Sequence, residues 1–143
     1  MDSSKLSSVD GYIHSHYDVG NSTLPIFSAD DLLTVGQLYE NSVINNLSEF
    51  STGLYTTGGV FFLEVTDPNL YRAFYDKYSD DQGHNLLVMN YSLYGIKKST
   101  DVIQATENFS SMLESTKSGL TLVYRLHGEN TIYYSDKGSI RKY

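Results

Sequence analysis

Two histidines and a serine–aspartate pair lie close together in the first quarter of the chain. His14 and His16 flank a single serine in the segment DGYIHSHYD, residues 10–18. Ser28 and Asp31 follow in the segment FSADD, residues 27–31. Two imidazoles, a hydroxyl and a carboxylate are side chains that can hold a metal ion and take part in hydrolysis.

The segment that carries the two histidines has the alternation of a short strand. Residues i and i+2 of a strand project to the same side, about 6.5–7 Å apart along the chain, so His14 and His16 can converge on one cation. Catalytic zinc sites use three protein ligands and leave a position for water. Asp31 is the candidate third ligand if residues 17–27 fold back across the strand end. We therefore predict a Zn²⁺ site at His14, His16 and Asp31, with Ser28 as a hydroxyl that donates to an oxyanion.

A simpler interpretation accounts for the same residues without a metal. Ser28 and Asp31 are spaced as the N-cap and N3 residues of a capping box at the start of a helix. The two histidines would then be polar residues at the end of a strand. His84 and His127 each stand beside a glycine, and we expect both to face solvent.

Composition limits the class of protein. A length of 143 residues suits one domain with a single hydrophobic core. The net charge of −7 argues against nucleic acid or an anionic membrane as the main partner. The absence of cysteine excludes disulfides, thiolate metal sites and cysteine nucleophiles. Residues 1–10 lack the apolar core of a signal peptide, and no apolar run reaches membrane-spanning length, so we expect a soluble chain of unassigned compartment.

The elements that must position these residues indicate an α+β domain with a mixed, largely antiparallel sheet and packed helices. We expect a flexible leader over residues 1–10 and a single domain over residues 11–143. Within that domain the patterns predict a strand at 11–16, a helix at about 28–45, and a hairpin at 51–67 that turns at Gly58 and Gly59. A second helix is expected from Pro68 with Asp67 as N-cap, and the stretch at 85–98 is ambiguous. A further helix within 99–119 that stops at Gly119 and a second hairpin at 120–138 follow.

The order His14-Ser15-His16, a loop, and then Ser28-Ala29-Asp30-Asp31 resembles the H-x-H…S-x-x-D signature of the JAB/MPN (JAMM) zinc metalloprotease family. The resemblance extends over residues 11–65 and implies a JAB/MPN-like, cytidine-deaminase-like fold. It also implies that His14, His16 and Asp31 bind zinc and that Ser28 stabilises the tetrahedral intermediate. The implied activity is hydrolysis of peptide or isopeptide bonds, with a peptide, a ubiquitin-like protein or another protein as substrate.

The chain departs from the family signature at three points. Tyr17 stands where the family has proline, the loop before Ser28 is longer, and no glutamate precedes His14 to act as general base. The chain is then a piece of a longer protein, a domain completed by an upstream segment or a partner chain, or a degenerate relative. Two classes of function remain open: a zinc-dependent hydrolase, and a non-catalytic interaction or accessory module of the same fold.

Overall fold

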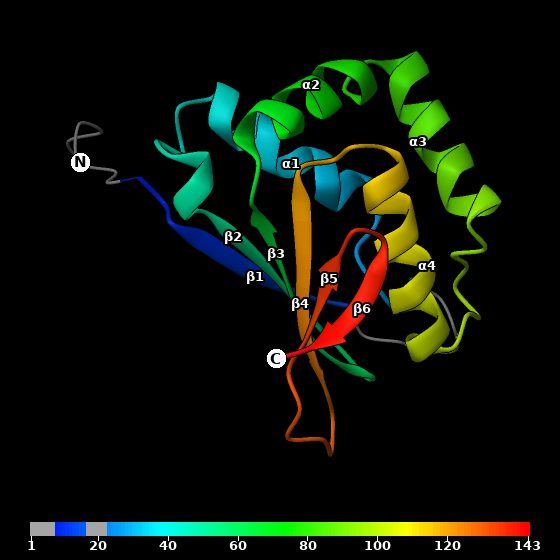
Figure 1. The fold of residues 1–143 in the computed structure, drawn as a ribbon. Helices are drawn as coiled ribbons and strands as arrows, with labels where there is room; N and C mark the ends of the chain where they lie inside the picture. Colours follow the sequence, from blue (N-terminus) through cyan, green and yellow to red (C-terminus); the bar gives the residue numbers. More distant parts are fainter. Residues whose placement is uncertain (1–7, 17–22) are drawn as a thin grey trace.

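The computed structural model describes residues 8–16 and 23–143, which form an α+β fold with one mixed sheet (Figure 1). The strands are β1 (Gly11–His16), β2 (Ser51–Thr56), β3 (Gly59–Val65), β4 (Leu120–Leu126), β5 (Tyr133–Asp136) and β6 (Ser139–Lys142). The helices are α1 (Ala29–Glu40), α2 (Pro68–Tyr78), α3 (Asp81–Leu93) and α4 (Val102–Ser115), with a short 3₁₀ helix, η2 (Leu47–Glu49).

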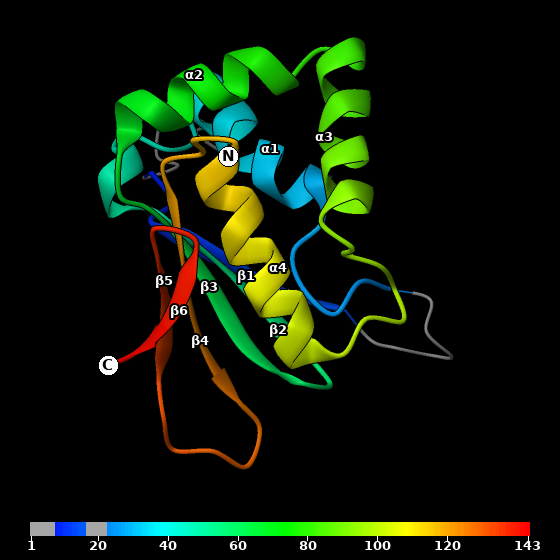
Figure 2. The same cartoon turned by 45° about the vertical axis from the view of Figure 1, so that its right-hand side comes forward.

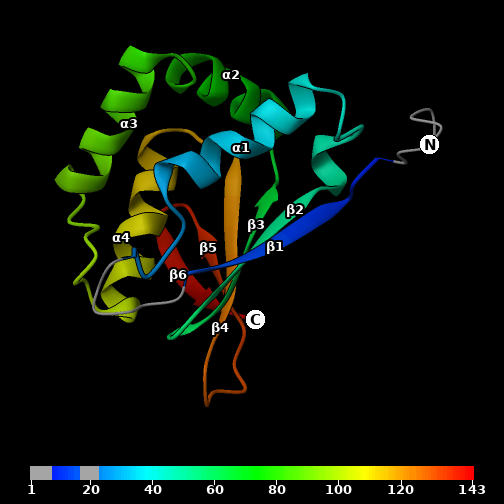
Figure 3. The ribbon, with the colours of Figure 1, turned by 180° about the vertical axis from the view of Figure 1, so that it is seen from behind.

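The strands lie in the sheet in the order in which they occur along the chain, β1-β2-β3-β4-β5-β6. β1 and β2 are parallel, and every other neighbouring pair is antiparallel. Parallel neighbours need a crossover connection, which α1 provides between β1 and β2. β1 is an edge strand of the sheet among the described residues (Figure 3), so the two histidines lie at a sheet edge.

The helices lie on one side of the sheet. α1 and α4 are nearest to it, and α2 and α3 form an arc around α1 (Figures 1 and 2). Alternation along β3 marks the two faces: Phe61 and Leu63 are buried, whereas Phe62 between them is exposed. His14 is paired with the fully buried Leu54, which is paired in turn with Phe61. The histidines therefore face the helices, as the period-two alternation predicts.

Two buried tyrosines hold α1 and the segment before it in place. The Tyr71 hydroxyl on α2 donates to the Leu32 carbonyl at 2.7 Å and accepts from the Gly36 amide at 2.7 Å, so it links α2 to the backbone of α1. The Tyr91 hydroxyl on α3 donates to the Phe27 carbonyl at 2.8 Å. Burial raises the pKa of both hydroxyls above the ordinary tyrosine value, because the phenolate would be poorly solvated there.

Several predicted elements are confirmed. The first hairpin is β2 and β3, α2 begins at Pro68 with Asp67 as its N-cap, and the helix within 99–119 is α4. The second predicted hairpin is β4 and β5. The ambiguous stretch at 85–98 belongs mainly to α3. The predicted leader lies largely outside the described residues, although the Val9 amide donates to the Val43 carbonyl.

Two helix ends were predicted wrongly, and one strand was missed. α1 ends at Glu40 rather than Asn45, because Ser42 adopts a positive φ of 59° that a helix does not allow. α4 ends at Ser115, and Gly119, at φ 69°, leads into β4. β6 was not predicted at all. No helix in the described part of the chain is both long and apolar enough to cross a membrane.

Candidate metal centre

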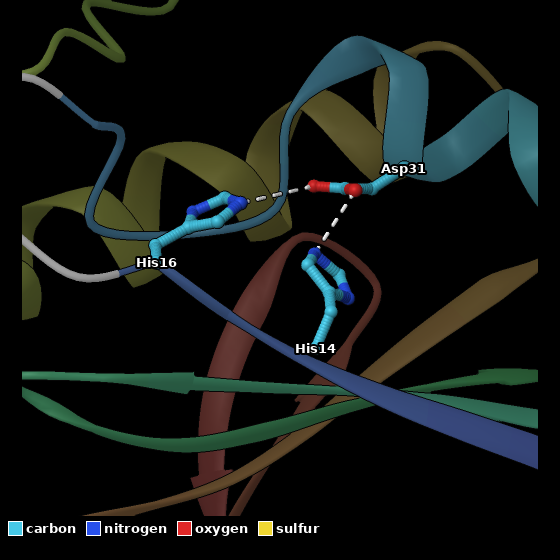
Figure 4. Close-up of side chains that lie close together, drawn as sticks. All are labelled: His14, His16 and Asp31. Atoms are coloured by element: carbon cyan, nitrogen blue, oxygen red, sulfur yellow. Dashed lines mark ion pairs between the residues drawn. The ribbon is translucent and has the colours of Figure 1, made fainter.

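The structure brings His14, His16 and Asp31 together where the end of β1 meets the first turn of α1 (Figure 4). One ligand atom from each residue lies within 4.8 Å of the other two. His14 Nε2 is 3.0 Å from Asp31 Oδ1, and His16 Nε2 is 3.7 Å from Asp31 Oδ2. Side chains from two separate elements, β1 and α1, therefore present two nitrogens and a carboxylate to one point.

The start of α1 fixes the position of Asp31. Ser28 is the N-cap, and its hydroxyl oxygen accepts from the Asp31 amide at 3.2 Å. Asp31 Oδ2 in turn accepts from the Ser28 amide at 2.7 Å and from the Ser28 hydroxyl at 2.9 Å. The predicted capping box is therefore present. Oδ2 accepts both of the hydrogen bonds that Ser28 donates to Asp31, whereas Oδ1 faces His14.

The orientation and tautomer of His16 are set by a backbone carbonyl. His16 Nδ1 lies 3.1 Å from the Leu24 carbonyl oxygen, which can only accept a hydrogen bond, so Nδ1 carries the proton. In a neutral imidazole the lone pair is then on Nε2, the atom nearest Asp31. Metal-binding histidines characteristically donate their other ring N–H to a carbonyl or carboxylate in this way.

His14 has no conventional hydrogen bond within the described part of the chain. Both ring nitrogens are buried, and neither has a hydrogen-bond partner among residues 8–16 and 23–143. Nε2 lies 3.0 Å from Asp31 Oδ1, but the two atoms lack the alignment of a hydrogen bond. Burial of a polar atom without a partner costs about 1–3 kcal/mol. A cation that accepts the Nε2 lone pair would satisfy this atom.

The donor set suits zinc. Two imidazole nitrogens and one carboxylate oxygen are ligands that Zn²⁺ accepts, and three protein ligands leave one position of a tetrahedral site open. Within residues 8–16 and 23–143, no other histidine or acidic residue joins the cluster. Glu64, on β3, is exposed on the face of the sheet opposite to the histidines.

The other candidate residues lie as follows. Ser28 is beside the cluster, but its hydroxyl proton is directed to Asp31 Oδ2. His84 is partly exposed, and its Nε2 contacts Asp30 Oδ1 at 2.8 Å. His127 is exposed, as predicted, although its Nε2 is 2.9 Å from the Thr56 carbonyl oxygen and its ring packs on Tyr55. Neither His84 nor His127 contributes to the cluster.

Sequence reasoning did not identify two residues that support the site. The Leu24 carbonyl that orients His16 belongs to the backbone, so its side-chain type gives no signal, although Pro25 after it favours an extended conformation at Leu24. Tyr91, which holds the carbonyl of Phe27 next to the N-cap, lies far away in sequence. Both contacts become visible only when the loop and α3 are placed.

Comparison with known proteins gives no relative: no family model, curated protein or solved structure matches the chain.

Proposed function

We propose that the chain is a zinc-binding domain of the JAB/MPN type whose centre hydrolyses peptide or isopeptide bonds. The observation that carries the proposal is the convergence of His14, His16 and Asp31, with ligand atoms within 4.8 Å of one another and the His14 nitrogens lacking hydrogen bonds among the described residues. The order of strand, loop and capped helix also supports it. The resemblance to the family rests on these residues and this order of elements.

Each residue of the proposed site has a separate role. His14 and His16 contribute nitrogen ligands, and the Leu24 carbonyl keeps the His16 lone pair on Nε2. Asp31 contributes its free oxygen, Oδ1, while the capping box holds Oδ2. Zinc, when bound, supplies Lewis-acid chemistry that polarises a carbonyl and makes water a stronger acid. Hydrolysis then adds the hydroxyl of water to the acyl carbon and a proton to the leaving amine.

The Ser28 hydroxyl has a conditional role in this proposal. In the structure it donates to Asp31 Oδ2, so donation to a substrate oxyanion requires that this bond be exchanged. The Ser28 amide at 2.7 Å still holds the same carboxylate oxygen after such an exchange. The serine is therefore able to turn toward a substrate without releasing Asp31.

Calorimetric titration of the metal-free protein with zinc tests the metal centre. We expect one zinc per chain in the wild type, and loss of binding in His14→Ala and in His16→Ala. His84→Ala is the matched control, because it removes an imidazole that lies outside the cluster, and it should bind zinc as the wild type does. Equal binding by wild type and His14→Ala, or no binding by either, would refute the metal centre.

A second function is favoured by one specific observation. Within the described residues the cluster contains a single carboxylate, Asp31, which is itself a ligand in the proposal, so no separate general base is in place. We therefore also propose, as the alternative, a zinc-stabilised accessory module without turnover. Zinc binding without hydrolysis of peptide or isopeptide substrates by this chain would favour the module, and hydrolysis that is lost in His14→Ala would favour the enzyme.

A further inference from the structure

A small pocket of about 210 Å³ opens next to the candidate metal centre. The pocket is lined by His16, by residues 23–25 before α1, by the turn between β2 and β3, and by the start of α4 with the segment before it. We call it the Lys98 pocket and define it by His16, Thr56, Thr57, Lys98, Ser99 and Val102. Its volume is below the range of about 300–1,000 Å³ that is common for drug-sized ligands, so it suits one small group.

The charge of the pocket is opposite to that of the chain. The chain as a whole carries a net charge of −7, yet no aspartate or glutamate is among the described residues that line the pocket. Lys98 contributes an ammonium group, and none of the ion pairs among the described residues involves it. Asp101, close by in sequence, caps α4 by accepting from the Ile103 and Gln104 amides and does not line the pocket.

Hydrogen-bond donors in the pocket are also available. The hydroxyls of Thr57 and Ser99 make no hydrogen bond to the described part of the chain, whereas the Thr56 hydroxyl already accepts from the Gly58 and Gly59 amides. Among the described lining residues, an ammonium group and two unpaired hydroxyls occur without a carboxylate, and this set is complementary to a ligand that only accepts hydrogen bonds. A carboxylate is such a group, and its bonds to charged donors are the stronger kind.

We propose that the Lys98 pocket binds a carboxylate of the substrate, either the C-terminal carboxylate or an acidic side chain. The binding step does not depend on zinc. Its consequence for catalysis rests on the proposed function: because His16 contributes both to the pocket wall and to the metal centre, a carboxylate held there places a neighbouring amide bond at the centre. The preferred substrate is then a peptide with a negative charge close to the bond that is cleaved.

The test compares two probes that differ only in this charge, acetyl-Ala-Ala with a free carboxylate and acetyl-Ala-Ala amide. Binding to the full chain is measured by NMR titration in the metal-free state, so that the carboxylate cannot be held by zinc. We expect the wild type to bind the free carboxylate about twofold to fivefold more tightly than the amide, as an ion pair with an exposed lysine provides.

Two neighbouring lysines provide the variant and its control. Lys98→Met keeps the aliphatic stem but removes the charge, and it should abolish the preference for the carboxylate. Lys97→Met changes a lysine that is exposed like Lys98 but does not line the pocket, and it should keep the preference. Equal binding of the two probes by the wild type, or an equal loss in both variants, would overturn the proposal.

Zinc titration of the same proteins separates this proposal from the proposed function. Lys98→Met should bind zinc as the wild type does, because Lys98 is not a ligand. A wild type that prefers the carboxylate but binds no zinc would support the pocket and refute the metal centre. A wild type that binds zinc but does not distinguish the probes would support the metal centre and overturn the pocket.

Discussion

Replacement of Asp31 by asparagine separates the two roles of this side chain, the helix cap and the metal ligand. Asparagine has nearly the same shape, and its amide oxygen can still accept from the Ser28 amide, which now donates to Oδ2 at 2.7 Å. What is lost is the negative charge in the first turn of α1, which stabilises a helix by about 0.3–1 kcal/mol. Without metal we therefore expect the free energy of unfolding of the variant to be lower than that of the wild type by about 1 kcal/mol or less.

The effect of Asp31→Asn should be larger when zinc is present. A ligand that binds only the folded state stabilises it by RT ln(1 + [L]/Kd), which is about 2.7 kcal/mol when free zinc is 100 times Kd. Even outer-shell partners of a metal site are worth about 10–100-fold in affinity, so loss of a direct ligand should raise Kd by about 100-fold or more. At the same zinc concentration the stabilisation of the variant then falls to about 0.4 kcal/mol or less.

Urea unfolding with and without buffered zinc measures both quantities. Asp30→Asn is the matched control, because Asp30 is the adjacent carboxylate on the same turn, is 83% exposed at its side chain and contacts His84 instead of the cluster. It should show a similar small loss of stability without metal and the full zinc effect. A zinc stabilisation of Asp31→Asn equal to that of the wild type would refute the role of Asp31 as a ligand and leave only the helix cap.

Three further perturbations test the surroundings of the site. Ser28→Ala should cost about 1 kcal/mol of unfolding free energy by removing the N-cap, yet leave zinc binding in calorimetry unchanged; loss of zinc would mean that the hydroxyl is needed to position Asp31. Gly83→Ala should cost about 1–3 kcal/mol in urea unfolding, because its Cβ would overlap the Lys77 carbonyl oxygen. Ser92→Ala, on the exposed side of α3, should cost little. Burial raises the folded-state pKa of Tyr91, so its contribution to the free energy of unfolding is complete below the ordinary tyrosine pKa of about 10 and is lost as pH rises above it. Tyr91→Phe should therefore reduce the fall in unfolding free energy at alkaline pH. An unchanged dependence of that free energy on pH would contradict this.

The arrangement of the histidines and Asp31 could be predicted because it follows from local rules. Period-two alternation places His14 and His16 on one face of β1 whatever the rest of the fold is. The spacing of Ser28 and Asp31 predicts a helix N-terminus, and the structure has the capping box there. Only the closeness of the strand end and the helix start had to be assumed. The crossover that makes β1 and β2 parallel neighbours provides it.

The elements that could not be predicted lack such a local signal. In α3 the apolar residues do not form a clean stripe, since Leu86, Met89 and Leu93 are exposed while Leu87 and Tyr91 are buried. The burial of α3 is decided by α1 and α2, against which it packs, and not by its own periodicity. β6 is four residues long and mostly exposed, and it exists because it pairs with β5. Tertiary contacts determine both elements.

In the proposed metal centre, the capping box uses Oδ2 of Asp31 and leaves Oδ1 for the metal, which reconciles the two interpretations of the motif. Oδ2 accepts two hydrogen bonds from Ser28, which fix the rotation of the side chain and leave Oδ1 directed at His14. A ligand held in this way loses little conformational freedom when a metal binds, and the hydrogen bond from the Ser28 amide is enough to hold it, so the helix cap does not compete with the metal. The tyrosine contacts from α2 and α3 extend the same effect, since they fix the backbone of α1 at Leu32 and of the segment before it at Phe27. The helices around α1 therefore hold the Asp31 carboxylate opposite the two histidines at the edge of the sheet, with Oδ1 at His14 and Oδ2 nearer to His16.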